Sequence, residues 1–164
     1  MSTVENLANT DLTTAYSKDY FKPGDTYRDA DSGGQYVWGV YWHGTGSVTT
    51  TGNSVCVPVL SSTNAAIFTA DVTDTDLQFQ DHVGYSPAQM ANKKRGWFKV
   101  GGKHIVKECS TTIAGLVKGT MFRVVATDKT IAPCTTRAIS AGITLEAFGA
   151  SAATTSAVWL FNFR

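Results

Sequence analysis

Short segments that alternate between the two faces of a strand dominate the hydrophobic pattern of this chain. In residues 36–42 one face of the predicted strand carries every second residue, namely Tyr36, Trp38, Val40 and Trp42. The opposite face carries Val37 and Tyr41, so both faces are apolar. A strand of this kind has to be covered on both sides, because an exposed sheet alternates apolar and polar residues.

A second segment with the same property is GWFKVGGKHIVKE, residues 96–108. It predicts a β-hairpin with Gly101 and Gly102 as a two-residue turn, because glycine tolerates the positive φ angles that such turns require. In this register Trp97 faces Val106 and Phe98 faces Ile105. Both faces of the hairpin base are then apolar, and we expect the chain's own core, a second internal sheet or a neighbouring subunit to cover them.

Clusters of Gly, Pro, Asp and Ser separate the predicted strands that follow residue 42. These strands lie at residues 54–60, 66–69, 96–100 and 104–108 (the two strands of the hairpin), 120–126, 139–148 and 157–163. The one helical signal is SPAQMANKKRG, with Ser86 suited to the N-cap, Pro87 to the first helical position and Gly96 to the stop. This pattern predicts an all-β fold, a compact β-sandwich or small β-barrel with one short helix.

Residues 1–22 differ from the rest because they are polar with scattered apolar side chains. These apolar residues include Leu12, Tyr16, Tyr20 and Phe21, too few to form a core of their own. We predict an extended N-terminal arm here, followed by a single β-rich domain over residues 23–164.

The charge composition excludes some partners. Only 16% of the residues are charged, and 14 Lys and Arg face 13 Asp and Glu, so the net charge is +1. Without a basic stripe, nucleic acid is not an expected partner. No apolar run has the length of a membrane span and no secretion signal begins the chain, so we expect folding in a reducing cytoplasm, with Cys56, Cys109 and Cys134 as free thiols.

Candidate chemistry is sparse. The three histidines, His43, His82 and His104, have no metal-ligand spacing, and the loop DADSGG at residues 29–34 lacks two oxygen ligands of a calcium loop. The carboxylates of DVTDTD at residues 71–76 indicate a solvated loop, and no nucleophile motif or phosphate-binding loop is present. We therefore expect no catalytic residues, no metal and no cofactor.

The aromatic residues allow two interpretations. Tyr36, Trp38, Tyr41, Trp42, Trp97 and Trp159 could line a sugar-binding face. A core position is favoured, because burying a ring contributes several times more free energy than one exposed stacking contact.

Several short motifs, in this order, resemble the auxiliary capsid proteins, or decoration proteins, of tailed bacteriophages. They are GDTYRD with GGQYVW (residues 24–38), GWFKVGG (96–102), IAGLVKGTMFRVV (113–125), ISAGITLEA (139–147) and AVWLFN (157–162). The resemblance spans nearly the whole chain, although residues 61–92 are longer than the family pattern. It implies a non-enzymatic virion protein that binds the outer surface of the assembled capsid and stabilises it. Its implied partners are the major capsid protein and further copies of itself, with a trimer favoured.

On this interpretation, the residues expected to contact the capsid or a neighbouring copy are Leu12, Tyr16, Tyr20, Phe21, Trp97, Lys99, Lys103 and His104. Two alternatives remain open. One is a carbohydrate-binding module or fibre-head protein that uses the aromatic strand of residues 36–42. The other is a head-completion or tail-tube protein, which would assemble as a ring.

Overall fold

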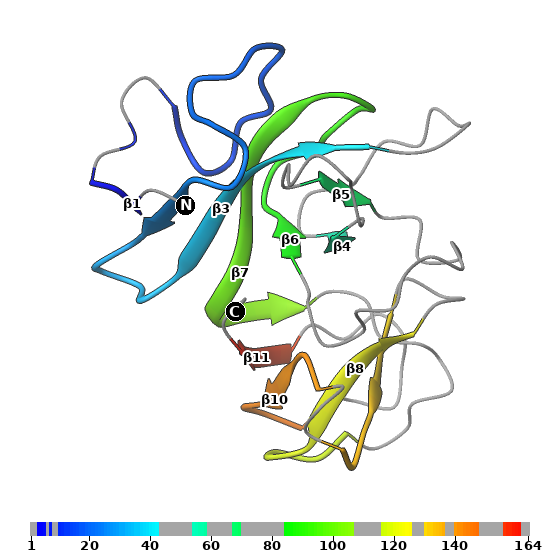
Figure 1. The fold of residues 1–164 in the computed structure, drawn as a ribbon. Coiled ribbons are helices and arrows are strands. Elements are labelled where there is room, and N and C mark those ends of the chain that lie inside the picture. The colour runs from blue at the N-terminus through cyan, green and yellow to red at the C-terminus, as the bar shows by residue number, and fades with distance from the viewer. Residues whose placement is uncertain are drawn as a thin grey trace.

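The computed structural model describes residues 3–5, 7, 10–42, 54–58, 67–69, 84–106, 116–125, 130–136, 140–147 and 156–161. These residues form eleven strands and no helix, and most of the strand pairs are antiparallel (Figure 1). The prediction of an all-β fold is confirmed. The described strands form a mostly antiparallel sheet, and the finer prediction of a sandwich or barrel is not confirmed. None of the described segments forms a helix capable of crossing a lipid bilayer.

The strands are β1 (Thr3–Val4), β2 (Thr26–Arg28), β3 (Gln35–Tyr41), β4 (Ser54–Pro58), β5 (Ile67–Thr69), β6 (Gly84–Ser86), β7 (Arg95–Val106), β8 (Met121–Val125), β9 (Thr130–Pro133), β10 (Gly142–Thr144) and β11 (Ser156–Leu160). They pair in the order β1-β2-β3-β5-β4-β6-β7-β11-β10-β8-β9, and β7 also pairs with β3. The successive pairings β3–β5–β4–β6–β7 therefore return to β3.

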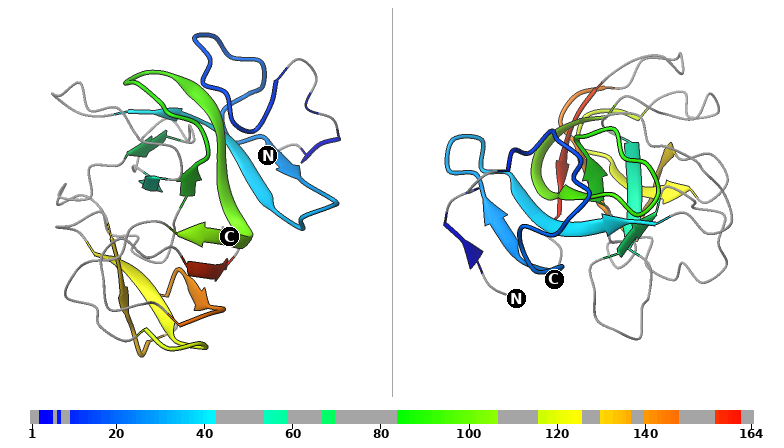
Figure 2. Two further views of the ribbon diagram at one scale, coloured as in Figure 1. Left: turned by 180° about the vertical axis from the view of Figure 1, so that it is seen from behind. Right: turned by 90° about the horizontal axis from the view of Figure 1, so that it is seen from above.

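The strand β7 replaces the predicted hairpin, and the hairpin prediction is wrong. Gly102 does adopt a positive φ of 86°, but it bends β7 instead of reversing the chain (Figures 1 and 2). Before the bend β7 pairs with β3, so that Trp97 lies opposite Trp38. After the bend it pairs with β11, so that Ile105 lies opposite Ala157. Both partners are distant in sequence, and their pairing decides between a turn and a bend.

The predicted helix at residues 86–96 is also wrong. Ser86 ends β6, and its Oγ donates to the carbonyl of Ala88 at 2.6 Å instead of accepting from a helical amide. Further along, the amide of Lys93 donates to the carbonyl of Tyr41, and the amide of Tyr41 donates to the carbonyl of Lys94. The backbone of this segment is thus hydrogen-bonded to the end of β3, and tertiary contacts override the local capping signals.

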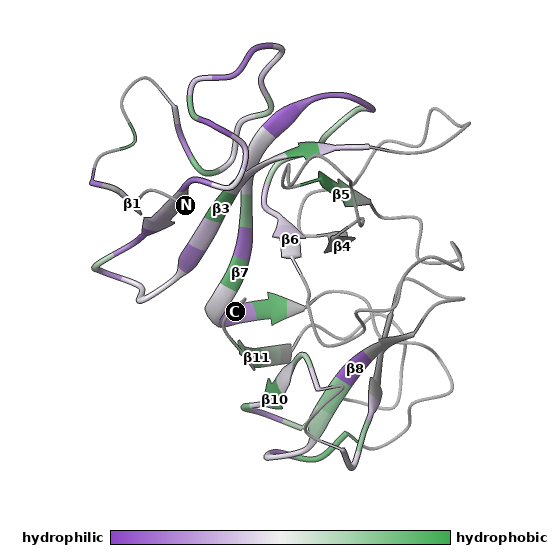
Figure 3. Cartoon of the chain, viewed as in Figure 1, coloured by the Kyte–Doolittle hydropathy of each residue, from purple (hydrophilic) through white to green (hydrophobic). Residues whose placement is uncertain are grey.

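One face of β3 and β7 contributes to a buried core. Its buried members are Val37, Tyr41, Cys56, Phe68, Ala88, Met90, Phe98 and Val100. The rings of Phe68 and Phe98 stack with their centroids 4.1 Å apart. Figure 3 shows hydrophobic and hydrophilic bands along β7, and its hydrophobic residues Phe98 and Val100 are the ones that it contributes to this core.

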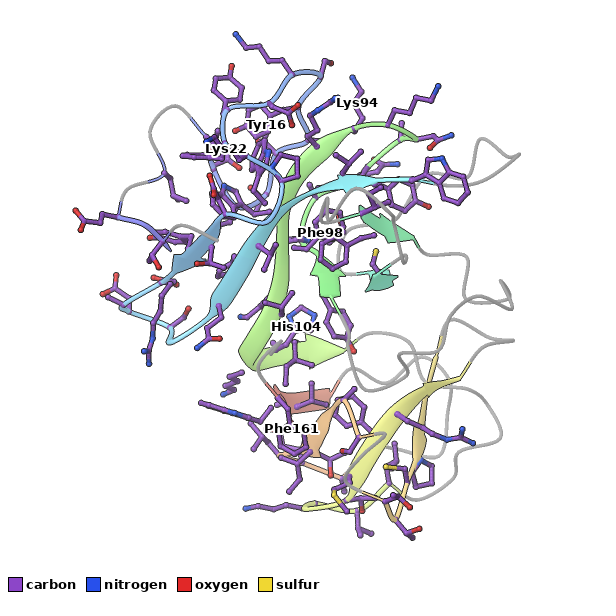
Figure 4. All side chains as sticks on the ribbon, in the orientation of Figure 1. Tyr16, Lys22, Lys94, Phe98, His104 and Phe161 are labelled. Carbon is purple, nitrogen blue, oxygen red and sulfur yellow. The ribbon has the colours of Figure 1, made fainter. Side chains whose placement is uncertain are left out.

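The opposite face of β3 and β7 is covered by the N-terminal segment. Tyr36, Trp38 and Trp97 form a cluster against which Leu7, Leu12, Tyr16, Phe21 and Tyr27 pack. The indole Nε1 of Trp97 donates to Thr10 Oγ1 at 3.2 Å, and the backbones of Tyr16 and Arg95 exchange two hydrogen bonds. Tyr16 and Lys22 lie over the upper part of the sheet in Figure 4. The chain itself therefore covers both sides of the apolar segment around Trp97, and the division into arm and domain at residue 22 stays a prediction.

Candidate binding site at the bend of β7

Beyond the bend, β7 joins a group of strands that buries one face and exposes part of the other. Directly opposite residues on antiparallel strands point to the same side. The register pairs Lys103 with Trp159 and Trp159 with Ile143, and Ile143 in turn with Met121. We call the side that carries Lys103, Ile105, Met121, Ile143 and Trp159 the outer face.

The outer face carries two large apolar side chains in contact with solvent. Ile105 is 56% exposed and Trp159 is 44% exposed. The other side of the same strands carries the buried residues His104, Phe122, Val158 and Leu160. This alternation is typical of an antiparallel sheet with a single core face. The exposed Ile105 and Trp159 therefore do not serve the core of this half of the molecule.

A hollow of about 430 Å³ lies at the bend, lined by Ser32, Lys99, Lys103, His104 and Ile105. Lys99 precedes the bend and Lys103 follows it, so the bend in β7 brings the two amines to one place. The hollow thus contains three of the residues predicted from sequence, Lys99, Lys103 and His104. The sequence placed them at a hairpin tip, and the structure groups them at a bend instead.

His104 is a buried, uncharged side chain. Its ring centroid lies 4.1 Å from that of Tyr85, and its Nε2 is buried with no hydrogen-bond partner among the described residues. Figure 4 shows the place of His104 on β7. Burial and, to a smaller extent, the positive charge of Lys99 lower the pKa of His104 to about 3. At neutral pH His104 is consequently a weak base, poorly suited to proton transfer.

Lys99 and Asp29 set the charge of the hollow. The Nζ of Lys99 lies 5.5 Å from the centre of the Tyr36 ring, within the range of a cation–π contact. Burial lowers the pKa of Lys99, and the negative charge of Asp29 opposes that shift. The pKa of the Asp29 carboxyl is lowered, chiefly because the Ser32 hydroxyl donates a hydrogen bond to it.

The chemistry of the hollow follows from these groups. Two amines and a neutral imidazole lie beside the apolar side chain of Ile105, an arrangement suited to an anionic group that borders an apolar surface. In the described part of the chain, no group of three His, Cys, Asp or Glu residues is placed to hold a metal ion. His43, His82, Cys109 and the carboxylates of residues 71–76 lie outside the described residues.

The remaining predicted contact residues lie elsewhere. Leu12, Tyr16 and Phe21 are partly buried against the cluster of Tyr36, Trp38 and Trp97. Trp97 itself has no exposed surface in this structure, which places it in the core. Tyr20 is exposed, with the Lys18 amine 4.9 Å from its ring centre. Contact of these residues with a capsid or a neighbouring copy stays a prediction.

The aromatic strand is mostly core. Tyr36, Trp38 and Tyr41 are buried in β3, and Trp42 beyond its end is 37% exposed. The favoured interpretation of this strand is confirmed, and it does not offer a row of exposed rings to a sugar. Sequence reasoning missed the exposure of Trp159, because the segment AVWLF is apolar at every position and carries no alternation.

Comparison of this chain with protein-family models, with curated proteins and with solved structures finds no significant match. The resemblance to phage decoration proteins therefore rests on the short motifs described above and stays a prediction.

Proposed function

We propose that this protein is a non-enzymatic structural protein of a tailed bacteriophage that binds the outer surface of the assembled capsid and stabilises it. The observation that carries the proposal is the outer face, where Ile105 and Trp159 are exposed although the other side of the same strands carries buried residues. Large apolar side chains gathered in this way mark surfaces that bind other proteins. The order of the motifs supplies the class of partner.

In this proposal the strands β3, β5, β4, β6 and β7 form a small closed β-barrel, for which their circular pairing is the support. The barrel serves as a rigid body that holds the β7–β11–β10–β8 outer face toward the shell. Each copy contacts the major capsid protein and neighbouring copies, with a trimer favoured. Weak contacts repeated over a symmetric lattice then add to a strong total attachment.

Binding to purified, undecorated phage heads tests the proposal directly. Trp159→Ala should reduce the number of bound copies strongly, because a central aromatic side chain often contributes 2 kcal/mol or more, as an approximate guide, to an interface. Trp42→Ala is the matched control, since Trp42 is about as exposed but lies at the end of β3, outside the outer face. Wild-type protein that does not bind heads, or equal losses for both variants, would contradict the proposal.

A carbohydrate-binding module is the second candidate, and the exposed indole of Trp159 favours it. An aromatic ring with a polar neighbour such as Lys103, its cross-strand partner, is also suited to stacking on a sugar. Binding of the isolated protein to a glycan array, lost in Trp159→Ala and retained in Trp42→Ala, would favour this function over capsid attachment.

A further inference from the structure

The hollow at the bend of β7 holds more positive charge than the described residues around it neutralise. Two amines, Lys99 and Lys103, line it, and Asp29 is the carboxylate whose charge acts on Lys99. Among the described residues Asp29 forms no ion pair with Lys99. Its oxygens instead accept hydrogen bonds within their own turn, from the Ser32 hydroxyl and from the amide of Asp31 at 3.2 Å. Among the described residues, two amines therefore face the charge of one carboxylate, and this excess of positive charge is suited to an anionic ligand.

A second observation at the same place is independent of the lysines. His104 is only 8% exposed and lines the hollow, yet its Nε2 has no hydrogen-bond partner in the described part of the chain. Buried polar atoms are nearly always hydrogen-bonded, because an unsatisfied one loses its contact with water without replacement. With its proton on Nε2, the neutral ring of His104 is a donor that lacks an acceptor among the described residues at the hollow.

The surroundings of the hollow restrict what that acceptor is. Ile105 lines one side of the hollow and is exposed on the outer face, where Trp159 lies opposite Lys103 in the sheet. A free inorganic anion retains its hydration shell and gains nothing from this apolar border. A carboxylate on a peptide interacts favourably with both features of the site. The carboxylate itself contacts the amines, and the residues next to it can pack on Ile105 and Trp159.

From this juxtaposition we infer that the hollow binds an Asp or Glu carboxylate of a partner protein, flanked in that protein by apolar residues. The carboxylate accepts from the amines of Lys99 and Lys103, next to the His104 ring that also lines the hollow. The flanking residues pack on the outer face. The inference rests on the proposed function only for the identity of the partner, which would be the major capsid protein.

The experiment uses the full chain and a synthetic peptide, acetyl-Leu-Glu-Leu-amide, with acetyl-Leu-Gln-Leu-amide as its uncharged match. The imidazole signals of His104 are followed by NMR during titration and are assigned with His104→Gln. Saturable shifts with the Glu peptide, and affinity at least about tenfold weaker with the Gln peptide, are expected, because hydrogen bonds to a charged group are about twice as strong as neutral ones. Equal affinity for the two peptides would overturn the inference.

Inorganic phosphate serves as the competing anion. We expect it to bind more weakly than the Glu peptide, since it makes no contact with Ile105 or Trp159. Phosphate that binds as tightly as the Glu peptide would show a general anion site and would overturn the assignment to a peptide carboxylate.

Charge variants locate the binding. Lys103→Gln and Lys99→Gln should each weaken binding of the Glu peptide by about fivefold or more, in the range of a partly exposed charged hydrogen bond. Lys118→Gln, an equal change of charge on the exposed turn before β8, should leave the affinity unchanged. Asp29→Asn removes the opposing charge and should tighten binding.

An equal loss in Lys118→Gln and Lys103→Gln would show a nonspecific charge effect and contradict the inference. The peptide assay contains no capsid, so its failure leaves the capsid proposal intact. Failure of the wild-type protein to bind heads, conversely, leaves the carboxylate site intact.

Discussion

The two halves of β7 show how one strand serves two different surroundings. Around Trp97 and Phe98 both sides of the strand are buried, one under the N-terminal segment and the other in the core formed with β3, β4 and β5. Around His104 and Ile105 one side is buried and the other is exposed. The bend at Gly102 separates the two situations. The first half of β7 stabilises the fold, and the second half is free to present a surface.

This difference predicts that stability and the proposed binding depend on different halves of a single strand. Substitutions before the bend remove contacts within the chain, so they should affect unfolding. Substitutions of the exposed residues on the outer face remove less buried surface, so they should affect the proposed binding more than unfolding. The comparison between the halves is therefore open to direct experiment.

The largest expected effect is that of Trp97→Ala. Trp97 has no exposed surface and contacts Phe21, Tyr27 and Trp38 with ring centroids 5.1, 5.8 and 5.4 Å away. Its loss should lower the free energy of unfolding by about 3–5 kcal/mol, the usual range for a large buried aromatic residue. Urea unfolding followed by circular dichroism measures the change.

The same substitution after the bend is the control. Trp159→Ala removes an equally large side chain that is 44% exposed, and it should lower the free energy of unfolding by about 1 kcal/mol or less. Similar losses for Trp97→Ala and Trp159→Ala would remove the distinction between the two halves.

The next effect is a pH dependence centred on His104. Burial lowers its pKa in the folded state from an ordinary 6.5 to about 3. Between these values the unfolded chain binds a proton that the folded chain does not, so stability falls as the pH falls through this window. The slope approaches about 1.4 kcal/mol per pH unit.

Comparison of wild type with His104→Gln isolates this histidine, because His43 and His82 are present in both proteins. Between pH 6.5 and 4.5 the free energy of unfolding should fall more steeply in wild type than in the variant. The lowered pKa values of Asp11 and Asp29 act in the same direction, with their unfolded value at 3.8, and so affect mainly lower pH. Parallel pH profiles for the two proteins would show that His104 is not held neutral by burial.

The bend itself gives a smaller effect. At Gly102 the φ angle is +86°, and an added Cβ would lie 2.8 Å from the carbonyl oxygen of Gly33. Gly102→Ala should therefore lower the free energy of unfolding by about 1–3 kcal/mol, from backbone strain together with this contact.

Gly119→Ala is the matched control for the bend. Gly119 has nearly the same φ, +87°, but nothing lies within 4 Å of its added Cβ. Gly119→Ala should therefore introduce the backbone strain without the close contact. It should destabilise the protein less than Gly102→Ala when both variants are measured by thermal unfolding. Equal effects would mean that the close approach of Gly33 does not hold the bend in place.

Many of the strands were predictable, because apolar segments between turn residues are a local signal. The predicted segments at 54–60, 66–69, 120–126 and 139–148 contain β4, β5, β8 and β10, and the segment at 157–163 overlaps β11, which begins at Ser156. The short strands β1, β2, β6 and β9 were not predicted. The conformation of Gly101 and Gly102 was not predictable. The same two glycines permit a reversal or a bend, and the choice depends on pairing with β3 and β11. The helix predicted after Ser86 was wrong for a similar reason, because the backbone of Lys93 and Lys94 forms hydrogen bonds with Tyr41 of β3.

The candidate site was predictable only in part. Lys99, Lys103 and His104 are close in sequence, so any reversal or bend between them brings them together. Their relation to Asp29 and Ser32 comes from the turn before β3, about 70 residues earlier in the chain, and depends on the pairing of β3 with β7. The exposure of Trp159 depends on which side of β11 meets the core, and the uniformly apolar sequence of that strand does not reveal this.

The smallest expected effect concerns the ion pair that joins the N-terminal segment to β7. The Nε of Arg95 lies 2.7 Å from Asp19 Oδ1, with side chains 29% and 42% exposed, and Trp38 Nε1 donates to the same oxygen at 3.4 Å. Asp19→Asn should lower the free energy of unfolding by about 1 kcal/mol or less, because partly exposed ion pairs are screened by solvent. The difference should shrink further in 1 M salt, where the range of charge interactions falls to about 3 Å. Urea unfolding of both proteins at low and high salt measures this difference.

Apolar packing of Leu12, Tyr16 and Phe21 remains in the variant and should hold the N-terminal segment in place. A loss well above about 2 kcal/mol that persists in 1 M salt would mean that this charge pair, and not burial, secures the cover over Trp97.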